Sequence, residues 1–193
     1  MNPFQVYKSV LNRYIDAQSA FYLESAWNEP HRKYHNINHL NSILEYIEDK
    51  RFGLNIKTYE VLVLAAFFHD AHYNPRDKKS HEDESIKKFL SSYIHKDEAV
   101  KNMVIQMIDS TRHRKIPLDD LVRLFWNADN AGFYKGYDEL VKNEHLIRQE
   151  FIFVMPDLYK KGRIDFLKSN LGLFNNKVDK DLKKLIEFVN KKY

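Results

Sequence analysis

The feature that most limits how this chain can fold is the segment from Val61 to Phe68, in which every residue is apolar. A helix that is apolar on every face has no side to present to water, so this segment predicts a buried central helix, with Thr58 as its N-cap. The run ends in two ionisable residues, His69 and Asp70. Unpaired charge is expensive to bury, and one bound cation would satisfy both side chains.

The remaining pattern predicts more helices and no strand. Asn2 and Pro3 are typical of a helix start, and apolar residues then recur at helical spacing as far as Ile15. Further helices are expected at about 36–49, 58–68, 80–93, 97–110, after Pro117, from Gly136 to about Lys160 with a kink or break at Pro156, and at 179–191. We see no repeat or linker. The sequence predicts an all-α, single-domain helical bundle over residues 1–193.

The composition excludes several classes of protein. Hydrophobic residues make up 44% and charged residues 30% of the 193 positions, which argues against disorder. Cysteine is absent, so any metal must be held by His, Asp or Glu. No apolar run is long enough to cross a bilayer and the start lacks a secretory signal, so we expect a cytoplasmic protein without a membrane partner. The net charge of +4 suits an anionic small molecule, and we do not expect nucleic acid as a partner.

The residues suited to chemistry lie in three short stretches. These are residues 34–40, 68–70 and 127–130. His35 and His39 are four residues apart, so a helix would place them on one face. Asp129 follows an apolar run, as the His-Asp pair does.

Imidazole and carboxylate groups without sulfur form a mixed nitrogen and oxygen ligand set. Such a set suits Mn²⁺, Fe²⁺, Co²⁺, Ni²⁺ or Zn²⁺ and leaves coordination positions open for water and substrate. A bound ion of this kind polarises a phosphoryl oxygen and lowers the pKa of bound water. The residue types alone also allow a different interpretation, in which the same side chains form a hydrogen-bonded polar cluster in a helical core.

The order of these stretches resembles the HD superfamily of metal-dependent phosphohydrolases, and in particular a small bacterial branch of it. The similarity covers most of the chain, at residues 32–40, 65–70 with Tyr73, 81–85, 147–151, Tyr159, Gly162-Arg163 and Leu167. The resemblance implies an HD-type helical domain. The metal ligands it implies are His39, His69, Asp70 and Asp129. It also implies that Asp70 can bridge to a second ion, if one binds.

The stretch Tyr34 to His39 also resembles the cyclic nucleotide phosphodiesterases, a eukaryotic branch of the same superfamily. There the second histidine binds metal and the first protonates the leaving oxygen. The resemblance therefore implies His39 as a ligand and His35 as a general acid. The resemblance ends there. Those enzymes place a second histidine four residues after the first, whereas His72 follows His69 by three, and their purine-clamping region has no counterpart in this chain.

Several residues admit two interpretations. Glu82 could orient the nucleophilic water or be a carboxylate favoured by a helix N-terminus. His81, which stands where the family has Asn, and His113 could hold a second metal or be ordinary surface or core histidines. Arg148 and Arg163 could recognise phosphate, or pair with carboxylates such as Glu150 and Asp165. Lys79 could contact substrate from the loop after the His-Asp pair, or simply be solvated.

The leading hypothesis is a phosphohydrolase that acts on a phosphorylated small molecule, such as a nucleotide. Its cofactor would be a divalent ion (Mn, Fe, Mg, Co, Ni or Zn), with a second ion as an option, and His35, Asp70 and Glu82 would be catalytic. One alternative is a di-iron oxygenase of the same superfamily. Another is a metal-stabilised module that binds a nucleotide without turning it over, because a fold does not establish catalysis. An exposed apolar face on a terminal helix would support a homodimer.

Overall fold

The structure, a computed structural model, describes residues 2–112 and 115–193. This part of the chain contains α-helices, two short 3-10 helices and no β-strand, which confirms the all-α prediction. The helices are α1 (Pro3–Val6), α2 (Lys8–Tyr14), α3 (Ala17–Trp27), α4 (Ile37–Asp49), η1 (Arg51–Gly53), α5 (Ile56–Phe68), α6 (His81–Ser92), α7 (Glu98–Ser110), α8 (Asp120–Asp129), η2 (Asn130–Lys135), α9 (Tyr137–Glu150), α10 (Pro156–Ser169) and α11 (Asn176–Lys192).

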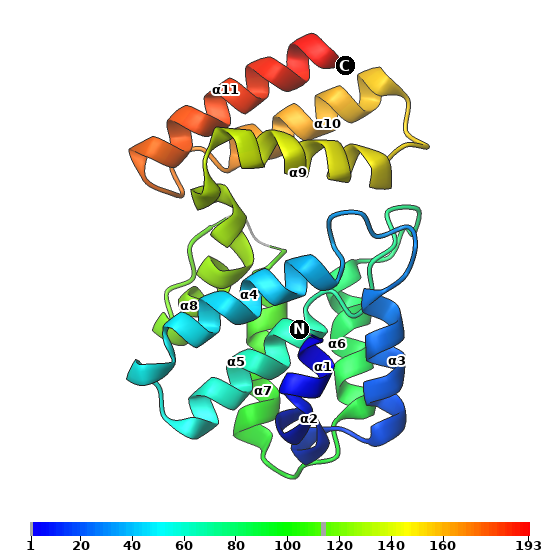
Figure 1. Cartoon of the computed structure of the whole chain (residues 1–193), viewed down its shortest axis with the longest axis vertical. Helices are drawn as coiled ribbons and strands as arrows, with labels where there is room; N and C mark the ends of the chain where they lie inside the picture. Colours follow the sequence, from blue (N-terminus) through cyan, green and yellow to red (C-terminus); the bar gives the residue numbers. More distant parts are fainter. Residues whose placement is uncertain (1, 113–114) are drawn as a thin grey trace.

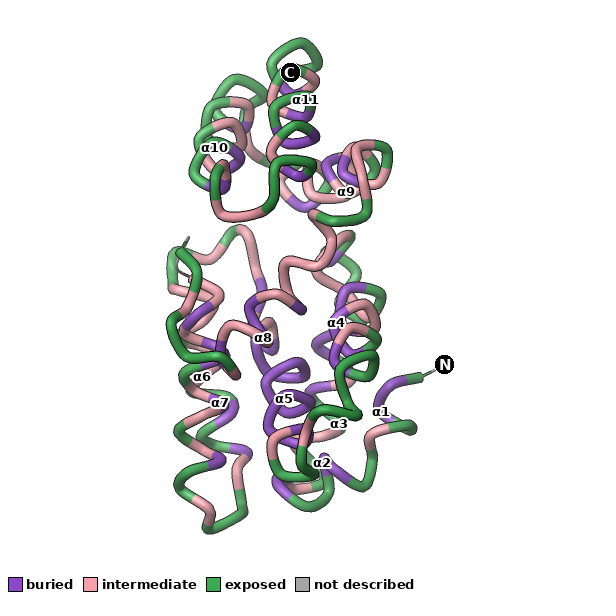
Figure 2. The backbone as a smooth tube through the Cα atoms, turned by 90° about the vertical axis from the view of Figure 1, so that its left-hand side faces the viewer, coloured by how far each residue is buried: buried purple, intermediate pink, exposed green. Residues whose placement is uncertain are grey.

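Helix α5 is the central element of the fold, as the apolar run predicts. Every residue from Tyr59 to Phe68 is buried, and the helix packs against α2, α4, α6, α7 and α8. Figure 2 shows it as a continuous buried stretch among the surrounding helices. The hydrophobic effect accounts for this position, because the run from Val61 to Phe68 is apolar on every face, and the one buried carboxylate, Glu60, is paired with Arg13 and Tyr14.

The buried apolar side chains form two clusters. The larger cluster fills the space between α1 and α8 around α5, and the smaller one lies among α9, α10 and α11. Figure 1 shows the three C-terminal helices as a layer stacked on one end of the larger bundle, with η2 leading into them. The two layers meet where the residues suited to chemistry lie.

Polar side chains fix where most of these helices begin. At eight of them an Asn, Asp or Ser accepts a hydrogen bond from a backbone N–H of the first turn: Asn2, Asp16, Asn36, Asn55, Ser80, Asp97, Asp119 and Asn175. These short oxygen-bearing side chains satisfy N–H groups that have no partner within the helix. The local sequence therefore determines the boundaries to within a few residues.

Two expectations about the helices are wrong. The N-cap of α5 is Asn55, whose side chain accepts from the Thr58 N–H, so the helix begins earlier than predicted. The expected first helix is two helices, α1 and α2, and it is followed by α3, where the sequence pattern predicted no helix. The expected break at Pro156 is confirmed, since residues 151–155 turn the chain before Pro156 starts α10, and α10 continues past Lys160 to Ser169.

The cap assignment at α5 gives a direct test. Asn55→Ala is expected to lower the free energy of unfolding by about 1 kcal/mol, because it removes the acceptor for the Thr58 N–H. Thr58→Ala is expected to change it by less than about 0.5 kcal/mol, since alanine suits a helix interior. Urea unfolding followed by circular dichroism measures both. Equal losses in the two variants would contradict the assignment.

None of the described helices is both long enough and apolar enough to span a membrane.

Candidate metal centre

The four predicted ligands come from the ends of three helices. His39 lies in the first turn of α4, His69 caps the C-terminus of α5 with Asp70 next to it, and Asp129 is the last residue of α8. Because α5 packs against both α4 and α8, these three ends meet at one point. Both histidines are nearly inaccessible, with 9% of His39 and 2% of His69 exposed.

The side-chain donor atoms converge. His69 Nε2 lies 3.4 Å from His39 Nε2, 3.3 Å from Asp70 Oδ2 and 3.6 Å from Asp129 Oδ1. His39 Nε2 lies 3.2 Å from the same Asp129 oxygen. One donor atom each from His39, His69 and Asp70 lies within 4.8 Å of the others.

This spacing fits a divalent ion. Metal–nitrogen and metal–oxygen bonds of about 2.0–2.2 Å place neighbouring ligand atoms about 3.0–3.5 Å apart, depending on the coordination geometry. Two imidazole nitrogens and two carboxylate oxygens also match the donor types that transition ions such as Mn²⁺, Fe²⁺ and Zn²⁺ accept. The residues present therefore fit a metal.

The tautomer of His69 is fixed by its backbone. Its Nδ1 lies 2.9 Å from the carbonyl oxygen of Ala66, which can only accept, so Nδ1 carries the proton. The lone pair of Nε2 is then available to a cation. Histidines that bind a metal through Nε2 are commonly oriented by a hydrogen bond from Nδ1 to a carbonyl oxygen or a carboxylate.

The charges of the cluster depend on one another. Burial lowers the pKa of His39. Burial acts in the same direction on His69, but the charge and hydrogen bond of Asp70 outweigh it and raise the pKa of His69 to about 9. Burial acts to raise the pKa of Asp70, yet the charge of His69 holds it well below its usual range. A proton on His69 or a cation at the centre would each satisfy the two carboxylates, so the polar-cluster interpretation and the metal interpretation share one geometry.

His35 stands beside this centre, held by a carboxylate from the other end of the chain. Its Nδ1 lies 2.8 Å from Oε2 of Glu150, and its ring stacks on Tyr73 with the centroids 4.1 Å apart. The hydroxyl of Tyr73 donates to the same Glu150 oxygen at 2.7 Å. Since the carboxylate accepts at Nδ1, Nε2 is the ring nitrogen that His35 offers to the cavity.

Glu150 is the important residue that the sequence did not assign to the site. It is 5% exposed, and its Oε1 accepts from the backbone N–H groups of Lys33, Tyr34 and His35. A carboxylate in the last turn of a helix faces the negative end of the helix dipole, so these bonds compensate an unfavourable position. The family resemblance at 147–151 included Glu150, and that motif was the signal that could have identified it.

Arg32 positions the segment that carries Asp70. It is 4% exposed, donates from Nη1 to the carbonyl oxygen of Asp70 at 2.7 Å and lies over the rings of Trp27 and Tyr73. Its Nε donates to the carboxylate of Glu29 at 2.9 Å, and its bond to Asp70 goes to the backbone, so Arg32 fixes the Asp70 segment without contacting the Asp70 carboxylate.

The low pKa of Glu150 makes stability depend on pH. Burial acts to raise this pKa, but the hydrogen bonds and charge of His35 lower it to about 2. Because the folded pKa lies below the unfolded one, the stabilisation is complete above the unfolded pKa and is lost as the pH falls toward the folded value. The difference in unfolding free energy between the wild type and Glu150→Gln is expected to shrink by about 2 kcal/mol between about pH 6 and about pH 3. Urea unfolding at each pH measures it, and a difference independent of pH would contradict this assignment.

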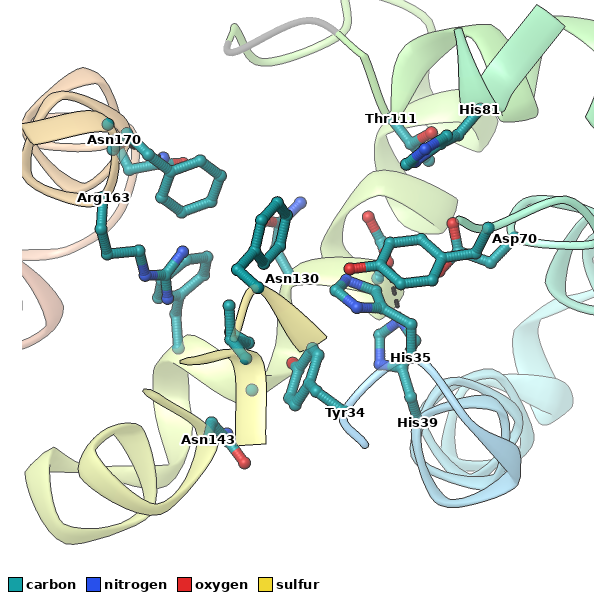
Figure 3. Close-up of a pocket in the computed structure, with 18 of the residues that line it drawn as sticks. Tyr34, His35, His39, Asp70, His81, Thr111, Asn130, Asn143, Arg163 and Asn170 are labelled. Atoms are coloured by element: carbon teal, nitrogen blue, oxygen red, sulfur yellow. Dashed lines mark hydrogen bonds and ion pairs between the residues drawn. The ribbon is translucent and has the colours of Figure 1, made fainter. Parts of the chain in front are cut away.

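A cavity of about 570 Å³ opens from the candidate metal centre toward the C-terminal helices. Figure 3 shows His35, His39 and Asp70 on one side of it and Arg163, Asn143 and Asn170 on the other. A volume of this size is typical of sites for small organic ligands, which are about 300–1,000 Å³. The cavity therefore has room for much more than a phosphate group.

Of the three predicted substrate-binding residues, only Arg163 lines the cavity. Arg163 lines the cavity, but its Nε donates to Glu144 at 2.6 Å, and Figure 3 places it away from His39 and Asp70. Arg148 donates to the carbonyl oxygens of Phe151 and Val154 and does not line the cavity. Lys79 is exposed and does not line it either.

Of the remaining candidates, two line the cavity and one cannot be placed. Glu82 lies in the first turn of α6 and accepts from the hydroxyl of Ser80. His81 also lines the cavity, but its Nε2 lies 2.9 Å from the carbonyl oxygen of Asn74, which leaves Nδ1 as its free nitrogen. His113 lies outside the described residues.

No family model, no curated protein and no solved structure matches this chain. Membership of the HD superfamily stays a prediction from the motifs.

Proposed function

We propose that the protein is a metal-dependent phosphohydrolase that cleaves a phosphate ester or phosphoanhydride. The observation that carries the proposal is the grouping of His39, His69 and Asp70 at the end of a cavity, with their donor atoms within 4.8 Å of one another. Asp129 lies against both histidines, and the His35–Glu150 pair stands beside the group. A metal centre next to an oriented acid–base group is the arrangement that phosphoryl hydrolysis requires.

The four ligands would hold a divalent ion. Such an ion, when bound, supplies charge stabilisation for a phosphoryl oxygen and an activated water. The residues themselves do the positioning: the Ala66 carbonyl orients His69, and Arg32 holds the backbone of Asp70. Burial of the histidines keeps bulk water away from the donor atoms and strengthens their electrostatic interactions.

His35 would donate a proton to the leaving oxygen. Its ring orientation is fixed by two contacts, the stacked ring of Tyr73 and the carboxylate of Glu150, so Nε2 is directed to the cavity at a small entropic cost. Glu150 acts through His35 and is a positioning residue. Arg163 belongs to the other end of the cavity, so it does not serve the phosphate at the metal centre.

The test is a hydrolysis screen of the protein loaded in turn with Mn²⁺, Fe²⁺, Mg²⁺, Co²⁺, Ni²⁺ and Zn²⁺. The panel contains nucleoside mono-, di- and triphosphates, cyclic nucleotides, aryl phosphates and alkyl phosphates, with Asp129→Ala run beside the wild type. Turnover by the wild type and not by the variant is the expected result. No turnover with any ion would contradict the proposal, and oxygen uptake by a protein with two irons would replace it with the oxygenase.

A further inference from the structure

The turn between α9 and α10 carries an unusual group of exposed apolar side chains. The exposed fraction is 68% for both Ile152 and Met155, 66% for Leu158 and 39% for Phe153. Elsewhere in the described part of the chain, no stretch of seven residues contains more than two exposed large hydrophobic side chains. Single exposed apolar residues are ordinary on a protein surface, whereas a group of them marks a surface that contacts another molecule.

This turn projects from the molecule. Residues 151–155 leave the end of α9 and reverse the chain before Pro156 starts α10. Figure 1 shows the turn at the right-hand end of the C-terminal layer, where it extends beyond both of the helices that it joins. The cavity reaches the base of the turn, because Phe151, Val154 and Leu158 line the cavity wall. The apolar surface is therefore convex at its tip and continues inward to the cavity.

Basic side chains surround the apolar tip. The guanidinium of Arg76 lies 4.1 Å from the centroid of the Phe153 ring, which places the loop after the His-Asp pair against the turn. Lys160 and Lys161 follow about one helical turn into α10. Residues 76–79 and 151–161 together contain five basic side chains and two acidic ones. The base of the turn is therefore positively charged, while its tip is apolar.

An apolar tip with basic residues set back from it matches the profile of an anionic bilayer surface. Apolar side chains are stabilised at the boundary between headgroups and acyl chains, and lysine and arginine side chains are attracted to the anionic headgroups above it. A protein partner would need a pocket that fits the tip, because protein interfaces are closely packed. A fluid bilayer accepts a convex apolar shape without such a pocket.

We propose that the turn between α9 and α10 docks the protein on an anionic lipid bilayer, with Ile152, Phe153 and Met155 in the interface. The contact is peripheral, because the turn is far too short to cross the hydrocarbon core. It departs from the expectation of no membrane partner, which considered only spanning segments and a secretory signal. Docked in this way, the cavity opens toward the bilayer surface, since its wall continues into the turn. The proposal does not depend on the chemistry of the candidate metal centre.

Vesicle sedimentation with the full chain tests the proposal. The vesicles are phosphatidylcholine alone, which is neutral, or an equal mixture with phosphatidylglycerol, which is anionic. The wild type is expected to bind the anionic vesicles about ten-fold or more tightly than the neutral ones. Ile152→Ser combined with Met155→Ser is expected to lower the partition coefficient by at least about thirty-fold, because two apolar side chains no longer enter the interface. Phe52→Ser combined with Ile56→Ser removes two exposed apolar side chains from another surface and is expected to leave it unchanged.

A second pair of variants tests the charged part of the surface. Lys160→Gln combined with Lys161→Gln is expected to weaken binding to the anionic vesicles by about ten-fold or more and to leave binding to neutral vesicles unchanged. The control is Lys177→Gln combined with Lys180→Gln, which removes the same charge from exposed positions near the start of α11. Equal losses from the two pairs would show that net charge alone attracts the protein to lipid, which would overturn the docking site.

A fluorescent label reports which surface meets the lipid. The chain has no cysteine, so one introduced cysteine gives a single labelling site. An environment-sensitive fluorophore on Met155→Cys is expected to shift its emission to the blue when anionic vesicles are added, and the same label on Phe52→Cys is not. Light scattering without vesicles tests a second copy of the chain as the occupant. A wild-type dimer that Ile152→Ser with Met155→Ser converts to a monomer, or an unshifted label at position 155, overturns the proposal.

Discussion

Asp129→Ala is expected to abolish stoichiometric binding of a divalent ion and to lower kcat/KM for phosphate esters by about a thousand-fold or more. One oxygen of Asp129 lies near both histidine nitrogens, 3.2 Å from His39 and 3.6 Å from His69, so its loss removes one of the four proposed ligands. Losing a bound ion removes several kcal/mol of charge stabilisation, and each 1.36 kcal/mol is about tenfold in rate. Metal content is measured by mass spectrometry on the dialysed protein.

The matched control is Asp120→Ala. Asp120 lies on the same helix, α8, but its side chain is 90% exposed and pairs with Arg123 at the surface. This variant is expected to keep both metal and activity, since exposed pairs contribute little. Far-ultraviolet circular dichroism should show native helicity in both variants. An Asp129→Ala protein that keeps one ion and full turnover would remove the aspartate from the site.

Glu150→Gln is expected to lower kcat by about a hundred-fold while changing KM little. The amide nitrogen that replaces one carboxylate oxygen cannot accept from both His35 Nδ1 and the Tyr73 hydroxyl, so the ring of His35 loses its fixed orientation. General acid catalysis contributes about 10²–10⁴ in rate. The loss should therefore be largest for alkyl esters, whose leaving oxygens need a proton, and smallest for nitrophenyl phosphate, which leaves readily without one.

Glu60→Gln separates this role from a loss of stability. Glu60 is also a buried carboxylate bound by a tyrosine hydroxyl, that of Tyr14, and by Arg13, but it lies away from the cavity. Both variants are expected to lower the unfolding free energy by about 1–3 kcal/mol, because each leaves buried donors without a charged acceptor. Dependence on the leaving group is expected in Glu150→Gln alone. The same dependence in both proteins, or in neither, would assign Glu150 a structural role.

The elements of the fold follow from local features of the chain. The eight polar caps and the apolar run of α5 act within a few residues, so their effects can be read from neighbouring positions. The errors have the same local origin. Asn55 and Thr58 both have side chains that can cap a helix N-terminus. The choice between them depends on which residue has the extended backbone that places its side-chain oxygen next to the N–H groups of the first turn.

The sequence by itself determined the four candidate ligands, because ionisable residues that end buried helices need a partner and their order resembles a family motif. It left open whether Arg163 meets phosphate, and it missed the role of Glu150. The role of Glu150 depends on residues more than a hundred positions apart, since Glu150 reaches the backbone at 33–35 from the end of α9. The place of Arg163 depends on its pairing with Glu144 on another helix. Only tertiary packing decides such contacts, because the same glutamate on an isolated helix would face water. The layer of α9, α10 and α11 likewise creates the cavity, and no pattern along the chain specifies the space between two layers.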